Sequence, residues 1–157
     1  MTTYLAAHKA VELEIIERIE ALTPHEQSRY RFRAYSDAAA ASRPIEQFVG
    51  TPRVFRLGAS TKVESVATCG GHYRETRIIA LQIVYPIDNF KGANWDAIRV
   101  DDLNSIRADL LNNPTVTAGV GYRIVQPTGA IETTKYADDP WHLETVPLEI
   151  YFDVTAS

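Results

Sequence analysis

The sequence predicts an α+β fold, in which a mainly antiparallel or mixed β-sheet carries two α-helices packed on one face. Two stretches have apolar residues at helical spacing, whereas the other patterned stretches show the alternation or the continuous apolar character of strands. These segments do not repeat as strand–helix–strand units. A chain of 157 residues can bury a full core without metal or disulfides, so we expect a single domain over residues 1–157.

The first helix is predicted over about residues 3–22, where apolar side chains recur every three or four positions. Thr2 or Thr3 can cap its start, and Pro24 ends it because proline disfavours helical geometry in the residue before it. The opposite face is charged and carries Glu14, Glu17, Arg18 and Glu20. Such a face is usually only solvated, and contact with a partner subunit is the functional alternative.

Residues 29–35 alternate in the manner of a half-buried strand, with Tyr30, Phe32 and Ala34 on one side. The other side carries three arginines and a tyrosine: Arg29, Arg31, Arg33 and Tyr35. Guanidinium groups suit phosphate and carboxylate alike, so this face could meet a phosphate backbone or the acidic surface of a partner subunit. A solvated face paired with nearby glutamates stays open as the simpler interpretation.

Residues 37–52 are alanine-rich and aperiodic, which predicts a long loop that includes Ile45 and Phe48. A strand follows at 53–58, and residues 62–67 have the pattern of another. Residues 69–72 read Cys-Gly-Gly-His and predict a turn.

The run at 76–85 is the most continuously apolar and ends at Pro86, so we expect a central strand covered on both faces. A polar loop at 88–96 contains Phe90 and Trp95. The second helix is predicted over 101–112, because Asp101 and Asp102 favour the positive end of a helix.

Strands at 119–126 and 129–134 flank a turn and predict a hairpin. The last strand, 143–154, alternates cleanly between apolar and polar residues. Pro147 has no N–H to donate, so it belongs at a strand start or at a sheet edge.

Several residues of types found in catalytic, metal or phosphate sites occur in this sequence, but their spacing and neighbours do not fit such sites. Cys69 and His72 share a flexible turn, which favours an inert thiol over a catalytic pair. The histidines are too widely spaced for a metal site: His8, His25, His72 and His142. The acidic pairs 101–102 and 138–139 fit a helix start and a turn, and Gly119-Val120-Gly121 precedes a strand instead of opening a helix. We therefore expect no catalytic, cofactor or metal site.

The formal net charge of −4 argues against a surface devoted wholly to nucleic acid, which requires clustered Lys and Arg. Charged residues interrupt the first 22 positions, so we expect neither a signal peptide nor a membrane span, and predict a chain kept in a cytoplasm.

The order of these elements resembles the tail terminator, or tail completion, proteins of long-tailed bacteriophages. The likeness covers the N-terminal helix, the Arg31-Phe32-Arg33 strand, the loop of small residues, Pro52 to Phe55, the strand ending at Pro86, the helix opening at Asp101, and the final strand from Trp141 to Val154. It is a likeness of pattern and not of a diagnostic motif.

The resemblance implies a non-enzymatic virion protein, assembled in the host cytoplasm as a hexameric ring on the end of the tail tube. Its partners would be copies of itself, the tail tube protein and the head connector or stopper, with DNA passing through the ring without specific binding. We expect contacts at Glu14, Glu17, Arg18, Arg29, Arg31, Arg33, Ile45, Phe48, Phe90 and Trp95. The alternatives are another head–tail joining protein, such as a stopper or adaptor, and a small module that binds an anionic ligand or nucleic acid on its arginine face.

Overall fold

A computed structural model describes residues 4–24, 30–35, 51–67, 72–87, 92–112, 115–117, 121–125, 132–135 and 141–155. The elements in chain order are α1 (Tyr4–Ala21), β1 (Arg33–Ala34), β2 (Val54–Ala67), β3 (His72–Pro86), α2 (Trp95–Asn112), β4 (Thr115–Thr117), β5 (Gly121–Val125), β6 (Glu132–Lys135) and β7 (Trp141–Thr155). The fold is α+β, as the sequence predicts.

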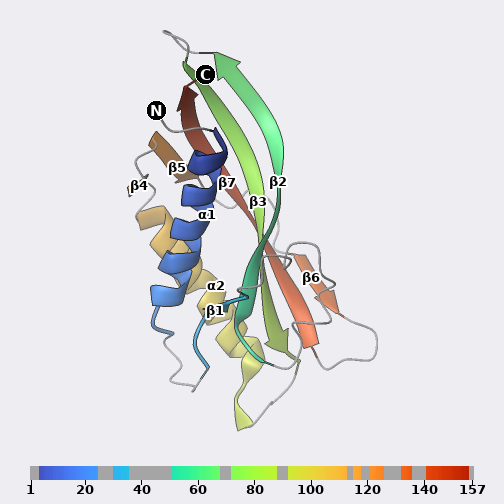
Figure 1. The fold of residues 1–157 in the computed structure, drawn as a ribbon. Helices are drawn as coiled ribbons and strands as arrows, with labels where there is room; N and C mark the ends of the chain where they lie inside the picture. Colours follow the sequence, from blue (N-terminus) through green and yellow to red (C-terminus); the bar gives the residue numbers. More distant parts are fainter. Residues whose placement is uncertain are drawn as a thin grey trace.

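The strands form one mixed sheet in the order β1-β2-β3-β7-β5-β4, with β6 also paired to β7. β1 runs parallel to β2, and the remaining pairs are antiparallel. β3 lies between β2 and β7 and pairs with β7 along its whole length (Figure 1). The central position expected for the most apolar strand is therefore confirmed.

Both helices lie on the same side of the sheet, which is the left side in Figure 1. Their inward side chains and those of the strands form one buried cluster. α1 contributes Val11, Ile15 and Ile19, and α2 contributes Trp95, Ile98, Leu103, Ile106 and Leu110. The apolar stripe predicted for α1 thus faces the sheet, and this layer is the main core.

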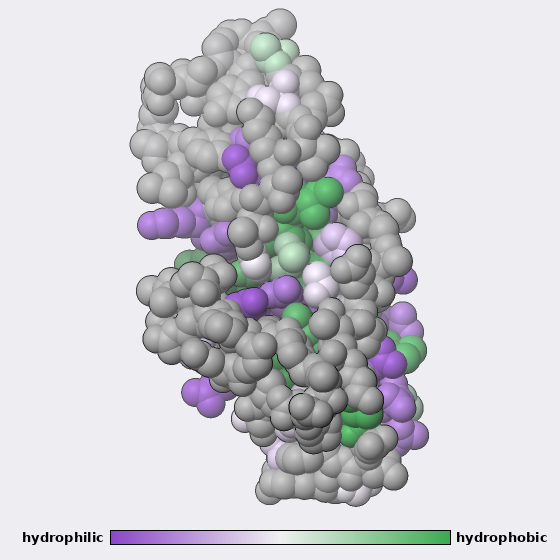
Figure 2. Space-filling model, turned by 90° about the vertical axis from the view of Figure 1, so that its right-hand side faces the viewer, coloured by the Kyte–Doolittle hydropathy of each residue, from purple (hydrophilic) through white to green (hydrophobic). Residues whose placement is uncertain are grey.

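Alternate residues of β3 point away from the helices, onto the face seen in Figure 2. There Ile78 and Ala80 are half-buried, whereas Ile79, Leu81 and Ile83 on the helix side are at most 2% exposed. Hydrophobic side chains show between hydrophilic ones in the middle of this face (Figure 2). The helices cover one face of β3, and this second face is covered only in part.

The strand boundaries differ from the predicted ones at both ends of the sheet. Only 33–34 of the predicted strand 29–35 pairs as β1, although the expected alternation holds, since Phe32 is buried and its neighbours are exposed. The two predicted strands within 53–67 are one strand, β2, because irregularities between Leu57 and Ser60 and between Lys62 and Glu64 let it continue pairing with β3.

The hairpin predicted for 119–134 is wrong. β5 and β6 both run antiparallel to β7, so they run in the same direction and cannot pair as a hairpin. They lie one after the other along β7, opposite 149–152 and 142–145. β4, which the sequence did not indicate, pairs with β5.

Pro147 lies in the middle of β7 and not at a strand start. It pairs with Ala80 of β3 on one side, and on the other side it falls between the stretches that pair with β5 and β6. Among the described strands Pro147 therefore occupies a local edge, where its missing N–H interrupts no ladder.

The second helix begins at Trp95, six positions before the predicted start at Asp101. Asn94 precedes it: the N–H of Ile98 donates to the Asn94 carbonyl at 3.1 Å, and the N–H of Ala97 lies 3.4 Å from Asn94 Oδ1. The expectation that Asp101 and Asp102 begin the helix is wrong, and the reason is the buried partner of Asp102 described below.

In the part of the chain that the structure describes, neither helix has the length of uncharged apolar sequence that a membrane crossing requires.

Candidate functional site

The most densely connected polar group in the described core is built around Arg53, immediately before β2. Its side chain is 0% exposed, and its backbone has a positive φ of 66°. Its N–H donates to the Val84 carbonyl at 2.9 Å, and its carbonyl accepts from the N–H of Arg33 at 3.2 Å. These bonds fix Arg53 between β1 and β3, in a left-handed conformation that non-glycine residues adopt at a cost.

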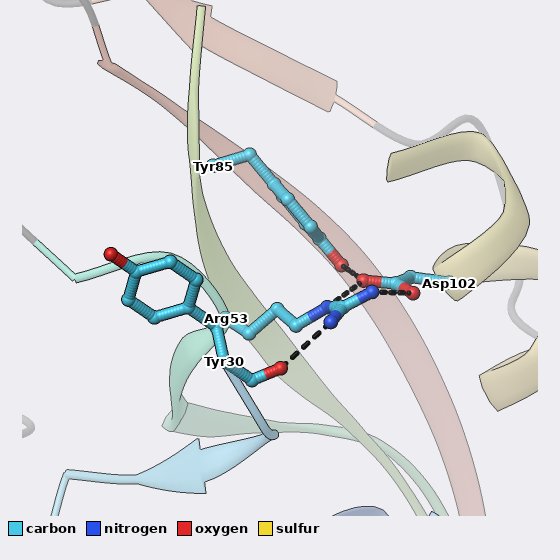
Figure 3. A network of polar contacts seen from close by, with 4 residues as sticks. All are labelled: Tyr30, Arg53, Tyr85 and Asp102. Carbon is cyan, nitrogen blue, oxygen red and sulfur yellow. Dashed lines mark hydrogen bonds and ion pairs between the residues drawn. The ribbon is translucent and has the colours of Figure 1, made fainter. Parts of the chain in front are cut away.

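The guanidinium of Arg53 uses all three of its nitrogens inside the protein. Nε and one terminal nitrogen donate to the two oxygens of Asp102 at 2.6 and 2.9 Å, and the other donates to the Tyr30 carbonyl at 2.7 Å (Figure 3). Phe32 and Trp95 lie 5.6 and 5.4 Å from the guanidinium carbon, which is within cation–π range. The charge is thus neutralised by Asp102 and enclosed by aromatic rings.

Tyr85 completes the network from β3, because its hydroxyl donates to Asp102 Oδ2 at 3.0 Å (Figure 3). Burial raises the pKa of the Tyr85 hydroxyl well above its ordinary 10.0, and the nearby Asp102 carboxylate raises it further. Burial also raises the pKa of the Asp102 carboxyl from 3.8, against the hydrogen bonds and charge of Arg53, which lower it. Tyr85 therefore stays protonated and acts as a donor.

This arrangement joins four parts of the chain: the segment before β1, the start of β2, the end of β3 and the middle of α2. Both Asp102 oxygens and every guanidinium nitrogen have protein partners, and the two side chains are 0% and 1% exposed, so the pair is closed to a substrate in this structure. The network therefore holds these four parts of the chain in position, and its loss would lower the free energy of unfolding.

The raised pKa of Tyr85 predicts a loss of stability at alkaline pH. Above about pH 10 the unfolded chain releases the Tyr85 proton while the folded chain keeps it, so the free energy of unfolding falls, by up to about 1.4 kcal/mol per pH unit. Tyr85→Phe removes this part of the fall. Denaturant unfolding of both proteins between about pH 9 and pH 11 measures the difference; equal slopes would contradict the expectation.

Two other carboxylates are buried under the helices. Glu144 of β7 is 0% exposed and accepts from Arg99 of α2 at 2.9 Å, and Glu75 of β3 is 2% exposed and accepts from Arg77 at 3.1 Å. Within the described residues, Glu75 Oε2 and Arg99 Nε are buried without a hydrogen-bond partner. An unmet buried polar atom costs about 1–3 kcal/mol, which offsets part of what each of these pairs contributes.

The residues expected to contact a partner subunit differ in their exposure. Arg31 is exposed just before β1, Arg33 is exposed on β1, as predicted for this face, and Glu17 is exposed on α1. Glu14 is half-buried. One terminal nitrogen of Arg18 donates to the carboxylate and the carbonyl of Asp109 of α2, both at 3.0 Å, so this side chain joins the two helices.

The structure corrects the expectation that Trp95 contacts a partner subunit, because its side chain is 1% exposed and belongs to the core. Its ring packs against Tyr30 and Tyr85, with centroids 6.0 and 6.4 Å away. A side chain so enclosed cannot contact a second subunit. The remaining predicted contacts lie outside the described residues: Arg29, Ile45, Phe48 and Phe90.

Most of the residues weighed for chemistry also lie outside the described part. This holds for Cys69, His25, Asp138, Asp139, Gly119 and Val120, and the side chains of His8, His72 and His142 are likewise not described. Gly121 begins β5. Asp101 is half-buried within α2. Among the residues that the structure describes, no group of three or more His, Cys, Asp or Glu could hold a metal ion.

Sequence reasoning missed Arg53, Asp102 and Tyr85 as a group. One signal was present: Asp102 stands on the apolar stripe that Trp95, Ile98 and Ile106 share, where a carboxylate requires a buried partner. The partner itself carries no such mark in the sequence.

No protein-family model matches this chain, and the search of curated proteins found no relative with significant sequence similarity. The function is therefore argued from the residues themselves.

Proposed function

We propose that this protein is a structural subunit of a virion, of the tail terminator type, that closes into a ring on the end of a phage tail tube. In this role it stops polymerisation of the tube and presents a surface to the head connector. The order of elements that carries the resemblance supports the proposal. The internal use of the Arg53 network agrees with a building block whose work is done by its surfaces.

The observation that carries the proposal is the exposure of Arg31 and Arg33 at the sheet edge. β1 is two residues long and is itself the edge strand of the described sheet, paired only with β2. The N–H of Ala34 donates to Glu20 of α1 at 2.8 Å, which fixes this edge against the helix. The result is a fixed cationic edge suited to the acidic surface of a neighbouring subunit.

Closing a ring requires a heterologous contact, in which one patch of each subunit meets a different patch of its neighbour. The arginine edge is one such patch. Exposed charges give register and orientation more than affinity, so the contact would select the correct neighbour among like subunits.

The test is the assembly state of the purified full chain, measured by light scattering and by negative-stain images. We expect rings with a central hole, in solution or on added tail tubes, and we expect Arg31→Glu with Arg33→Glu to abolish them. Arg107→Glu, an exposed charge on α2, is the matched control and should assemble normally. A chain that stays monomeric at high concentration and on tubes would sink the proposal.

The same arginines favour a second candidate, a module that binds an anionic ligand or nucleic acid. Binding of a labelled oligonucleotide that falls steeply with salt, and that Arg31→Glu removes, would favour it. No binding at low salt would eliminate it. A stopper or adaptor would join tail to head without capping free tubes, which the tube experiment distinguishes.

A further inference from the structure

The outward face of α1 carries a large exposed apolar side chain. Leu13 is 57% exposed, on the side of the helix away from the buried residues Val11 and Ile15. One turn before it stands Lys9 and one turn after it Glu17, both exposed. Residues four apart share a helix face, so these three side chains form one outward stripe, which we call the Leu13 stripe.

The Leu13 stripe is complementary to itself. Lys9 and Glu17 each stand four residues from Leu13, which is about 6 Å along the helix axis. When two copies of α1 cross antiparallel about a two-fold axis at Leu13, Lys9 of each copy lies beside Glu17 of the other. We propose that a second copy of this chain docks on α1 through the Leu13 stripe, leucine against leucine and lysine against glutamate.

The exposed face of α2 shows that such complementarity is not general. Val100 is 52% exposed, which makes it the second large apolar side chain on the described surface. The residues four positions away are Asp96 and Asn104, and a two-fold crossing at Val100 would bring an acid to an amide. α2 therefore offers an apolar residue without the charges that would orient a copy, and Val100 serves as the matched control.

The contact is small, because it involves one exposed face of a single helix. Each exposed Lys–Glu pair contributes about 0.2–1 kcal/mol and is screened by salt. The dimer is accordingly weak on its own, and the charge pairs set the antiparallel orientation.

This two-fold contact is distinct from the contact that closes a ring, which is heterologous. It pairs two free subunits, or two rings face to face. The inference does not rest on the proposed function, and the arginine variants that test the ring leave the Leu13 stripe unchanged.

Crosslinking tests the geometry in any assembly state. Packed helices lie about 8–10 Å apart axis to axis, which brings facing Cα atoms near the range of about 4.4–6.8 Å that a disulfide needs. In a Cys69→Ser background, we expect Leu13→Cys to form disulfide dimers under mild oxidation about tenfold faster than Val100→Cys. Equal rates for the two variants would overturn the proposal.

Charge reversal tests the orientation, with sedimentation of the full chain as the readout. Lys9→Glu and Glu17→Lys each place like charges together, and we expect each to weaken self-association about tenfold. The double variant exchanges the charges and should return to within about threefold of the unchanged chain. A double variant no tighter than the single ones, or an unchanged chain with no self-association at its highest soluble concentration, would overturn the proposal.

Discussion

Replacing Asp102 by alanine is expected to lower the free energy of unfolding by about 3–5 kcal/mol, because it leaves the charge of Arg53 buried without its partner. The guanidinium is 0% exposed, and the two bonds to Asp102, at 2.6 and 2.9 Å, are its contacts with an opposite charge. The rings of Phe32 and Trp95 lie 5.6 and 5.4 Å from the guanidinium, and neither supplies an opposite charge in place of the carboxylate. Urea unfolding of the two proteins, with equal m-values, measures the loss.

The double variant Arg53→Met with Asp102→Leu separates the cost of an orphaned charge from the value of the pair. Removing both charges takes away their desolvation as well as their attraction, so we expect it to be more stable than Asp102→Ala by about 2 kcal/mol or more. Asp101→Ala, a half-buried neighbour on the same turn of α2, is the control and should cost far less. A double variant no more stable than Asp102→Ala would contradict a coupled pair.

The fold was largely predictable because its main elements depend on local patterns. α1 has an uninterrupted apolar stripe ended by Pro24, and β3 has the longest apolar run, so their positions follow from periodicity and continuity. The start of α2 was not predictable in the same way. Its stripe, which begins at Trp95 and Ile98, is interrupted by Asp102, and an aspartate near a helix more often marks the first turn than the middle.

The network could not be predicted because its parts are joined by tertiary structure. Arg53 and Asp102 are 49 positions apart in the sequence, and no local pattern between them indicates that the two side chains meet. The positive φ of Arg53 is also invisible in sequence, since glycine or asparagine is the usual sign of that conformation. The hairpin of β5 and β6 failed for a similar reason, because both strands take their direction from β7.

Trp95→Ala is expected to cost about 3–5 kcal/mol, the range for an aromatic residue removed from a core. Trp95 is 1% exposed and begins α2, where its ring packs against Tyr30 and Tyr85 and flanks the Arg53 guanidinium at 5.4 Å. The cavity would open beside a buried charge and admit water to the Arg53 network. We therefore expect the free energy of unfolding to fall by more than the loss of buried apolar area alone would cause.

That second effect distinguishes a structural tryptophan within the network from one that only fills space. If the cavity left by Trp95→Ala admits water, the guanidinium that Asp102→Ala leaves without its partner is solvated. We then expect the difference in free energy of unfolding between Arg53→Met/Asp102→Leu and Asp102→Ala to be smaller in a Trp95→Ala background. Val100→Ala, exposed on the same helix, is the control and should change stability by no more than about 0.5 kcal/mol. An unchanged difference in the Trp95→Ala background would mean that the ring fills volume without shielding the ion pair.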